Sequence, residues 1–271
     1  MEIRKMNNPR LSVAPTAEEI AARIETLTCD RCDAGNLLPF DFTFAFQPIV
    51  DINTKTTHSY EALIRGIHGE GASTILSQVD WATRFRFDQL CRAKVITLAS
   101  QLGVDTFLNI NFLVNAVYNP DHCIQLTLEV ARKMNFPVEK IILETTEEEK
   151  IEDPNFLRSV LDGYRKYGLL VAIDDFGEGY SSLNLLAQLR PEYIKLDRQL
   201  ISEIQADKTK TLIVEAIVKL CQNLSIKVIG EGVETIDEVR ILRDMGVYLF
   251  QGYYFARPGF ETLPTVSSWE L

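Results

Sequence analysis

The sequence of 271 residues predicts an α/β protein in which eight strands close into a barrel and one strand runs against the others. Strand-like and helix-like stretches alternate along most of the chain, which is typical of parallel strands joined by crossover helices. Before them, residues 42–50 and 56–65 flank the turn Asn53-Thr54-Lys55 and predict an antiparallel hairpin. Eight strands are the number that closes such a barrel. An open doubly wound sheet is the alternative, but no Gly-rich dinucleotide turn follows the first strand.

The remaining elements follow in order, each as a helix that leads to a strand. The expected helix and strand pairs are 75–102 with 106–112, 123–134 with 140–145, 155–167 with 169–174, 182–189 with 193–197, 209–223 with 227–230, and 236–245 with 248–251. No internal linker interrupts them, so residues 41–271 are expected to form one barrel domain.

Residues 1–40 differ in character and predict an N-terminal arm. The start is polar, and Thr16-Ala17-Glu18-Glu19 has the capping-box pattern that opens a short helix toward Thr28. Cys29 and Cys32 form a C-x-x-C, half of a zinc or redox motif. Because no second pair follows, two ordinary thiols are the favoured interpretation and a metal or redox role is the alternative. Five scattered cysteines fit a reducing compartment.

Composition excludes several classes of protein. The chain has 28 Lys and Arg against 38 Asp and Glu, a formal charge of −10, which argues against binding long nucleic acids. Hydrophobic content of 46% excludes wholesale disorder. The longest apolar runs are too short to cross a bilayer, and no leader is recognisable. We therefore expect a cytoplasmic protein without membrane insertion.

Polar side chains occur at the end of nearly every expected strand, where barrel enzymes have their catalytic residues. These residues are Glu61, Asn109, Asn111, Glu144, Asp174, Asp175, Lys195, Asp197, Glu231 and Gln251. One such residue can simply mark a strand's exit into solvent, but a whole rim of carboxylates repels itself unless cations intervene. Oxygen ligands suit Mg²⁺ or Mn²⁺, and two ions that share a bridging acid clamp a phosphate during in-line displacement.

Other mechanisms lack support in the sequence. His58, His68 and His122 lie outside the acidic set, and His58 is expected to be exposed. Zinc hydrolase, Cys–His and Ser–His–Asp mechanisms therefore have no support. Lys195 could orient water or neutralise charge at the metal site. The alternative is a simple pair between Lys195 and Asp197.

A loop with two glycines follows the acid pair Asp174-Asp175. Asp-Phe-Gly occurs in protein kinases, but the other kinase motifs are missing. Gly177, Glu178 and Gly179 either form a mobile lid or regulatory element beside the metal site or make a plain tight turn.

From about Phe46 to Pro258, the chain resembles the EAL-domain cyclic di-GMP phosphodiesterases. The resemblance rests on eight motifs in order. They are Phe46-Gln47-Pro48-Ile49-Val50, Glu61-Ala62-Leu63 with Arg65, Leu108-Asn109-Ile110, Leu143-Glu144-Thr145-Thr146-Glu147, Asp174 to Leu183, Ile194-Lys195-Leu196-Asp197, Glu231-Gly232-Val233-Glu234-Thr235, and Gln251-Gly252-Tyr253 ending in Arg257-Pro258.

The resemblance implies a modified TIM (β/α)8 barrel with one antiparallel strand and hydrolysis of cyclic di-GMP to linear pGpG, which lowers the level of this bacterial second messenger. Two Mg²⁺ or Mn²⁺ ions would act, with Glu61, Lys195 and Glu231 in catalytic roles. The implied ligands are Glu61, Asn109, Glu144 and Asp174 for one ion, and Asp174, Asp175 and Glu231 for the other.

By the same resemblance, a further set of residues would bind substrate: Gln47, Arg65, Asp197, Gln251 and Pro258. Glu147 would steady the loop that contains Gly177, Glu178 and Gly179. The family also implies a homodimer, and a sensory or signalling protein partner is expected. Gly230, Glu178 and Asn111 depart from the usual pattern, but none of them removes a ligand. A catalytically silent EAL-type receptor is the main alternative, and a different metal-dependent barrel enzyme of the enolase type is a third.

Overall fold

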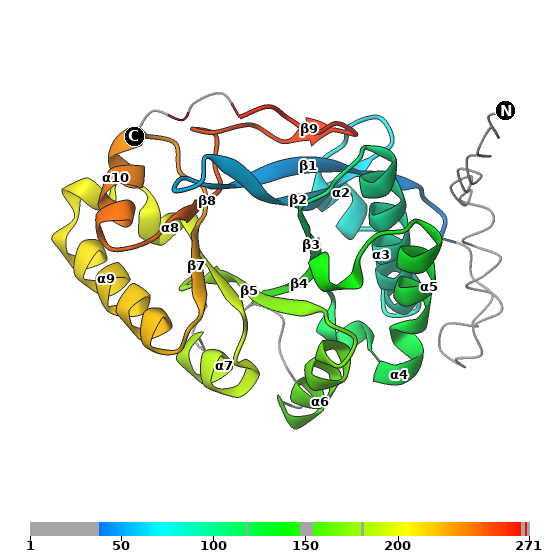
Figure 1. Ribbon diagram of the computed structural model, residues 1–271. Helices are drawn as coiled ribbons and strands as arrows, with labels where there is room; N and C mark the ends of the chain where they lie inside the picture. Colours follow the sequence, from blue (N-terminus) through cyan, green and yellow to red (C-terminus); the bar gives the residue numbers. More distant parts are fainter. Residues whose placement is uncertain (1–37, 118, 147–153, 180–181, 267–268, 270–271) are drawn as a thin grey trace, which may run out of the picture.

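The structure is a computed structural model that describes residues 38–117, 119–146, 154–179, 182–266 and 269. Its strands are β1 (Phe42–Asp51), β2 (Thr56–Gly66), β3 (Phe107–Asn111), β4 (Ile141–Thr146), β5 (Leu170–Phe176), β6 (Tyr193–Leu196), β7 (Lys227–Gly230), β8 (Leu249–Phe250) and β9 (Gly259–Phe260). Strands β2 to β8 follow one another around a ring, and β1 closes it by pairing with both β8 and β2 (Figure 1). The predicted closed barrel is confirmed.

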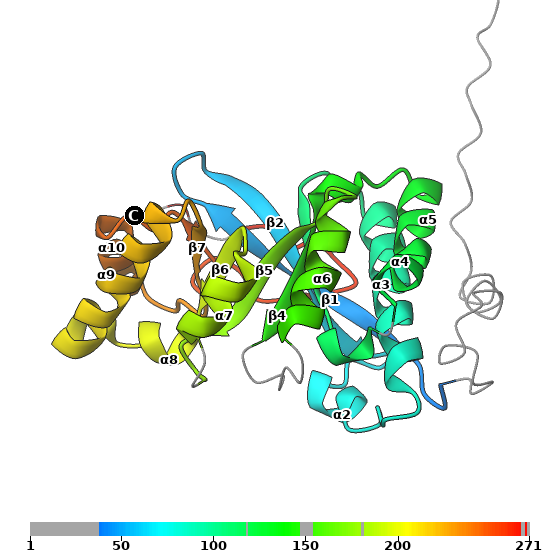
Figure 2. The same cartoon turned by 90° about the horizontal axis from the view of Figure 1, so that it is seen from below.

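One strand of the ring is reversed. β1 pairs antiparallel with β2 and β8, whereas each step from β2 to β8 is parallel. The turn of the β1–β2 hairpin projects at one end of the barrel, and α2 (Ala72–Leu76) lies at the other (Figure 2). Outside the ring, β9 adds a short antiparallel pairing to β1, which the sequence did not indicate.

Helices surround the barrel (Figure 1). They are α3 (Arg84–Gln101), α4 (Pro120–Cys123), α5 (Gln125–Lys133), α6 (Pro154–Arg165), α7 (Ser182–Leu189), α8 (Arg198–Ile201), α9 (Lys208–Asn223) and α10 (Ile236–Asp244), with 3₁₀ turns at Val114–Ala116, Val138–Lys140 and Ile204–Ala206. Among the described residues, none of the helices combines the length and the apolar character needed to cross a membrane.

The single helix expected over 75–102 is wrong, because the chain forms α2 and α3 with a turn between them. Asp80 causes the break: its side chain accepts hydrogen bonds from the N–H groups of Ala82 and Thr83. Such bonds compete with the helical backbone pattern. The short helix expected from Thr16 lies outside the described residues, as do Cys29 and Cys32.

Alternation along the strands divides the core into two parts. Outward side chains such as Leu108, Leu143 and Ile194 belong to the large apolar cluster that packs strands against helices. Inward side chains form a separate cluster of Ile49, Ile142, Ala172, Tyr193, Ile229 and Leu249. Since successive residues of a strand face opposite sides, both faces of these strands are buried. The inward cluster fills the barrel and forms the floor of the site.

His58 lies beside this floor and is not exposed as expected. Its ring stacks on Phe107 at a centroid distance of 5.1 Å, and Nε2 lies 3.2 Å from the Tyr193 hydroxyl. Burial lowers the pKa of His58 to about 4, and the nearby Lys227 acts in the same direction. The ring is therefore neutral in the folded protein.

Candidate active site

Above the apolar floor, each of the eight ring strands places one polar side chain at the barrel mouth. These are Gln47, Glu61, Asn109, Glu144, Asp174, Lys195, Glu231 and Gln251. Six of them follow a residue of the floor, or Phe107 packed against it, by two residues; Gln47 precedes Ile49 because β1 runs the other way, and Glu61 follows the buried Ser59. Apart from Gln47, the sequence predicted these residues at strand ends. The structure instead places five of them within their strands and buried: Glu61, Asn109, Glu144, Asp174 and Lys195.

Lys195 lies at the centre of this layer and is fully buried. Its Nζ is 2.9 Å from Asp174 Oδ1, 3.0 Å from Glu61 Oε2, 3.3 Å from Glu231 Oε2 and 3.6 Å from Glu144 Oε2. The alternative pairing of Lys195 with Asp197 is not what the structure shows. Asp197 instead accepts the N–H of Gln199 at 2.7 Å and so caps α8.

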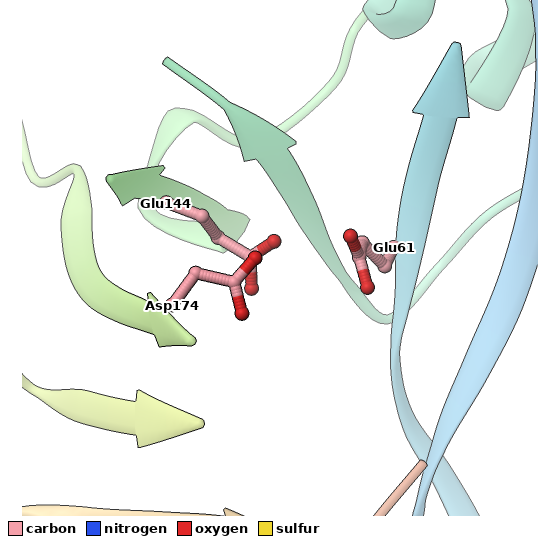
Figure 3. Close-up of side chains that lie close together, drawn as sticks. All are labelled: Glu61, Glu144 and Asp174. Atoms are coloured by element: carbon pink, nitrogen blue, oxygen red, sulfur yellow. The ribbon is translucent and has the colours of Figure 1, made fainter. Parts of the chain in front are cut away.

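In the part of the chain that the structure describes, three groups of carboxylates have oxygens close enough to share a cation, and two of them include Asp174. One group is Glu61, Glu144 and Asp174, whose side chains point toward one another inside the barrel (Figure 3). The other is Asp174, Asp175 and Glu231, and Asp174 belongs to both. Together these five acids and Lys195 leave a formal charge of −4, which two divalent cations would neutralise.

Two buried polar oxygens at the site, Asn109 Oδ1 and Gln251 Oε1, have no hydrogen bond among the described residues, and Glu144 Oε2 and Glu231 Oε2 have only ion-pair contacts with Lys195. Asn109 donates its amide to Glu144 Oε1 at 2.7 Å, which leaves its own oxygen facing the site. Buried oxygens that lack donors cost free energy, unless a cation coordinates them. The residues present therefore fit a site for hard divalent ions.

Asp175 reaches the site through a distortion of β5. In a regular strand it would face away from Asp174, because neighbouring side chains alternate. The pairing of β5 with β6 shifts register between Ile173 and Phe176, and Asp175 has a φ of +50°. Such a bulge turns a side chain toward a new direction. The consecutive acids thus serve one site.

Electrostatics at the site reflect burial and crowding. Burial raises the pKa of Glu144 and of Glu231 well above the usual range, although Lys195 lowers both. Burial, followed by the charge of Asp174, raises the pKa of Asp175 to about 7. Burial alone would lower the pKa of Lys195, but the carboxylates around it, Asp174 first, raise it well above the usual range. The lysine therefore stays charged.

Amide side chains donate hydrogen bonds to Glu61. Gln251 donates to Glu61 Oε2 at 2.7 Å and to Gln47 at 3.1 Å, while Asn111 donates to Glu61 Oε1 at 3.3 Å. Gln47 also donates to the Ala256 carbonyl. These bonds join β1, β2, β3 and the exit of β8, so they hold Glu61 in one orientation.

The loop after β5 lies against α8. An added Cβ at Gly177, whose φ is +105°, would be 2.4 Å from Leu200 Cδ1, so only glycine fits this close approach. Gln199 donates to Glu178, and Glu178 groups with Asp175 and Asp197. Gly179 follows within the described residues, whereas Glu147 lies outside them, so its expected role in steadying this loop stays a prediction.

Two cavities are lined in part by the segment that follows β8, and the smaller one reaches Glu231. The smaller, about 160 Å³, is lined by Gln47, Arg198, Glu231, Gly232, Glu234, Gln251, Gly252 and Tyr253. The larger, about 400 Å³, is lined by Ala45, Arg65, His68, Gly69, Tyr253, Arg257, Pro258 and Phe260. Arg65 and Pro258 thus lie away from the carboxylates. Sequence reasoning missed Tyr253 and Arg257 as site residues, although both stand just after the last ring strand.

Known proteins resemble this chain over most of its length. A crystal structure of a standalone EAL protein from Vibrio cholerae O395 with cyclic di-GMP bound is 48% identical, has a TM-score of 0.83, and covers 85% of this chain and 98% of its own. The manganese and cyclic di-GMP complex of Klebsiella pneumoniae BlrP1 is 36% identical with a TM-score of 0.77, over 83% of this chain and 58% of that one.

Two curated relatives come from Escherichia coli K12. The blue light- and temperature-regulated antirepressor BluF and the probable cyclic di-GMP phosphodiesterase PdeG are each 29% identical over 83% of this chain. The chain spans 56% and 45% of their lengths. The family model of the EAL domain matches residues 38–258. With its closed barrel, one reversed strand and the acids at its mouth, this chain belongs to the EAL domain family.

Proposed function

We propose that the protein hydrolyses one phosphodiester bond of cyclic di-GMP to give linear pGpG, using two Mg²⁺ or Mn²⁺ ions. The observation that carries this proposal is the pair of carboxylate groups that share Asp174 beside Lys195, together with the buried oxygens Asn109 Oδ1 and Gln251 Oε1, which have no hydrogen bond among the described residues. Solved relatives support it, because two of them are described as complexes with cyclic di-GMP, and one of these also contains manganese.

Glu61, Asn109, Glu144 and Asp174 would hold one ion, and Asp174, Asp175 and Glu231 would hold the other. Two ions bound there would offset the charge of the phosphate and make water a stronger nucleophile near neutral pH. Their sites would share Asp174, which belongs to both carboxylate groups.

The chain's own residues would orient the attacking water and the phosphate, and they would transfer the proton. Glu231 is the acid with most access to solvent among the four that face Lys195, so it would accept a proton from the attacking water. Lys195 would donate a hydrogen bond to that water or to a phosphate oxygen. Water adds to phosphorus, the bond to the 3′ oxygen breaks, and that oxygen gains the proton.

Substrate contacts are proposed at residues that line the cleft. Gln47 and Gln251 would border the phosphate, Arg65 would pair with phosphate charge, and Pro258 would pack against the ligand. Asp197 caps α8 in this structure, so its contribution would be to hold that segment.

We also propose a cytoplasmic location, because Cys91, Cys123 and Cys221 are buried free thiols, as expected in a reducing compartment. A homodimer and a sensory or signalling partner stay predictions.

The test is incubation of the purified chain with cyclic di-GMP and either metal, with separation of products by chromatography. Wild type should form pGpG, a chelator should stop it, and Glu61→Ala should lower the rate by at least about a thousandfold. Glu215→Ala, which removes an exposed acid on α9, serves as the matched control. Retained activity in Glu61→Ala would refute the assigned site.

A silent receptor is the second candidate, because the relative BluF is described as an antirepressor. Tight binding of cyclic di-GMP by wild type, with no pGpG in the presence of Mg²⁺ or Mn²⁺, would establish the receptor instead of the enzyme.

A further inference from the structure

We propose that Asp88 is a positioning residue for the metal site: it fixes the backbone just after β3, so that Asn111 can hold Glu61 in one orientation. Asp88 belongs to α3, which lies outside the ring of strands (Figure 1). This inference rests on the proposed function, because it assigns to a residue outside the barrel the support of a ligand to the same metal ions.

Asp88 and Arg92 form a buried ion pair on α3. Asp88 is 1% exposed and Arg92 is fully buried, and Arg92 Nη2 lies 2.6 Å from Asp88 Oδ2. Arg92 also donates to the Thr127 hydroxyl of α5 at 3.2 Å, and its guanidinium carbon lies 5.6 Å from the centroid of the Phe112 ring. A buried ion pair is costly to desolvate, and apolar side chains of similar volume often stabilise a protein as much. Stability alone therefore does not account for this pair.

The other oxygen of Asp88 is bonded to the chain that leaves β3. Asp88 Oδ1 accepts the N–H of Leu113 at 3.2 Å, and the N–H of Phe112 donates to the Glu144 carbonyl at 2.8 Å. An ionised carboxylate is a stronger acceptor than a neutral group. Two consecutive N–H groups after β3 are thus held, one by the neighbouring strand β4 and the other by the helix α3.

Asn111 needs this support because it lies at the end of its strand. The pairing of β3 with β2 ends at Ile110, and its pairing with β4 ends at Asn111. The Asn111 side chain is exposed, yet its amide donates to Glu61 Oε1 at 3.3 Å. Since this bond is long, a small displacement of the backbone would break it. The bonds made by the N–H groups of residues 112 and 113 oppose such a displacement.

The orientation of Glu61 decides which of its oxygens faces the metal ions. Glu61 Oε2 accepts from Lys195 and Gln251, whereas Asn111 donates to Oε1. Without the bond from Asn111, the carboxylate is freer to rotate about its last single bond. Groups that orient a metal ligand typically change metal affinity by about tenfold to a hundredfold. Asp88 would therefore act on metal affinity through Asn111.

The test compares two pairs of apolar replacements in the full chain, with the Mn²⁺ dissociation constant measured by calorimetry. Asp88→Leu with Arg92→Met removes the ion pair and the backbone acceptor, and should weaken Mn²⁺ binding about tenfold. Arg165→Met with Glu192→Leu is the matched control, because Glu192 also pairs with an arginine and accepts a backbone N–H, near the start of β5. The control should bind Mn²⁺ within about twofold of wild type.

Two further variants separate positioning from stability. Asp88→Asn loses the charge but keeps an acceptor oxygen in the same place. Its urea midpoint should fall, while its Mn²⁺ affinity should stay within about twofold of wild type. Asn111→Ala should weaken Mn²⁺ binding about tenfold. Adding it to the Asp88→Leu and Arg92→Met pair should weaken binding no further, because both changes act through one contact.

Three results would overturn the proposal. The first is wild-type Mn²⁺ affinity in the Asp88→Leu and Arg92→Met variant. The second is a loss of about a hundredfold when Asn111→Ala is added, since independent effects multiply. The third is an equal loss in Asp88→Asn, because the loss would then follow the charge and not the acceptor. If these variants bind Mn²⁺ as expected but wild type forms no pGpG, the positioning role stands and the proposed hydrolysis fails.

Discussion

Lys195 Nζ lies 3.0 Å from Glu61 Oε2, across the width of the barrel. The two side chains come from β6 and β2, which are four places apart in a ring of eight strands and therefore opposite each other. Lys195 is the only cation in the polar layer that the described ring strands contribute, and four acids share it. The lysine therefore holds together a layer that carries excess negative charge.

Replacing this lysine should make folding depend on metal. Lys195→Met should destabilise the metal-free protein by about 3 kcal/mol, because it leaves buried carboxylates without their counter-charge. Mn²⁺ should then raise the urea midpoint more in the variant than in wild type. Lys219→Met, an exposed position on α9, is the control. An equal Mn²⁺ effect in Lys195→Met and wild type would contradict this role of Lys195.

Glu144→Gln should weaken metal binding and leave the stability of the metal-free protein nearly unchanged. Burial raises the pKa of Glu144 well above its usual range, so burial opposes the charged form of this side chain, and an amide of the same shape removes that charge. The metal-free free energy of unfolding should change by less than about 1 kcal/mol. Stabilisation by Mn²⁺ should be largely lost, as should turnover. Thermal unfolding with and without Mn²⁺ measures this, and a full Mn²⁺ response in the variant would count against Glu144 as a ligand.

His58 should make stability fall in mild acid. The folded protein holds its pKa at about 4, while the unfolded chain protonates it below about pH 6.5. The stability from the neutral ring is thus present above about pH 6.5 and is lost as the pH falls toward 4. Between about pH 7.5 and about pH 5, wild type should lose about 2 kcal/mol that His58→Phe keeps. Urea unfolding at both pH values checks this, with exposed His68→Gln as control. Parallel losses in wild type and His58→Phe would refute it.

Gly252 should tolerate no side chain. A Cβ there would meet the Val233 carbonyl oxygen at 2.1 Å, so Gly252→Ala should destabilise the protein by about 2 kcal/mol and weaken binding of cyclic di-GMP by moving Tyr253. Gly163→Ala is the matched comparison, because its nearest atom is 3.8 Å away and the residue lies in α6. That variant should gain about 1 kcal/mol. Equal unfolding free energies for the two variants would contradict the close approach.

Sequence alone predicted the ring of strands, the hairpin that reverses β1, and the acids that belong to the site. These follow from short-range patterns, since alternation within a strand decides which residues share a face. The prediction of one helix over 75–102 was wrong, because the Asp80 side chain accepts backbone N–H groups that a continuous helix would use in its own hydrogen bonds. Propensity over a long window does not resolve such a turn.

Tertiary structure alone decided how the site is assembled. Closure of the barrel brings Glu61 to Lys195 across 134 residues of sequence, and a bulge turns Asp175 beside Asp174. Barrel closure also brings Lys195 next to Asp174 instead of the nearby Asp197, and it places Tyr253 where it lines both cavities. Sequence periodicity determines only the face on which a side chain lies. Distances between strands that are far apart in the chain depend on how the whole ring closes.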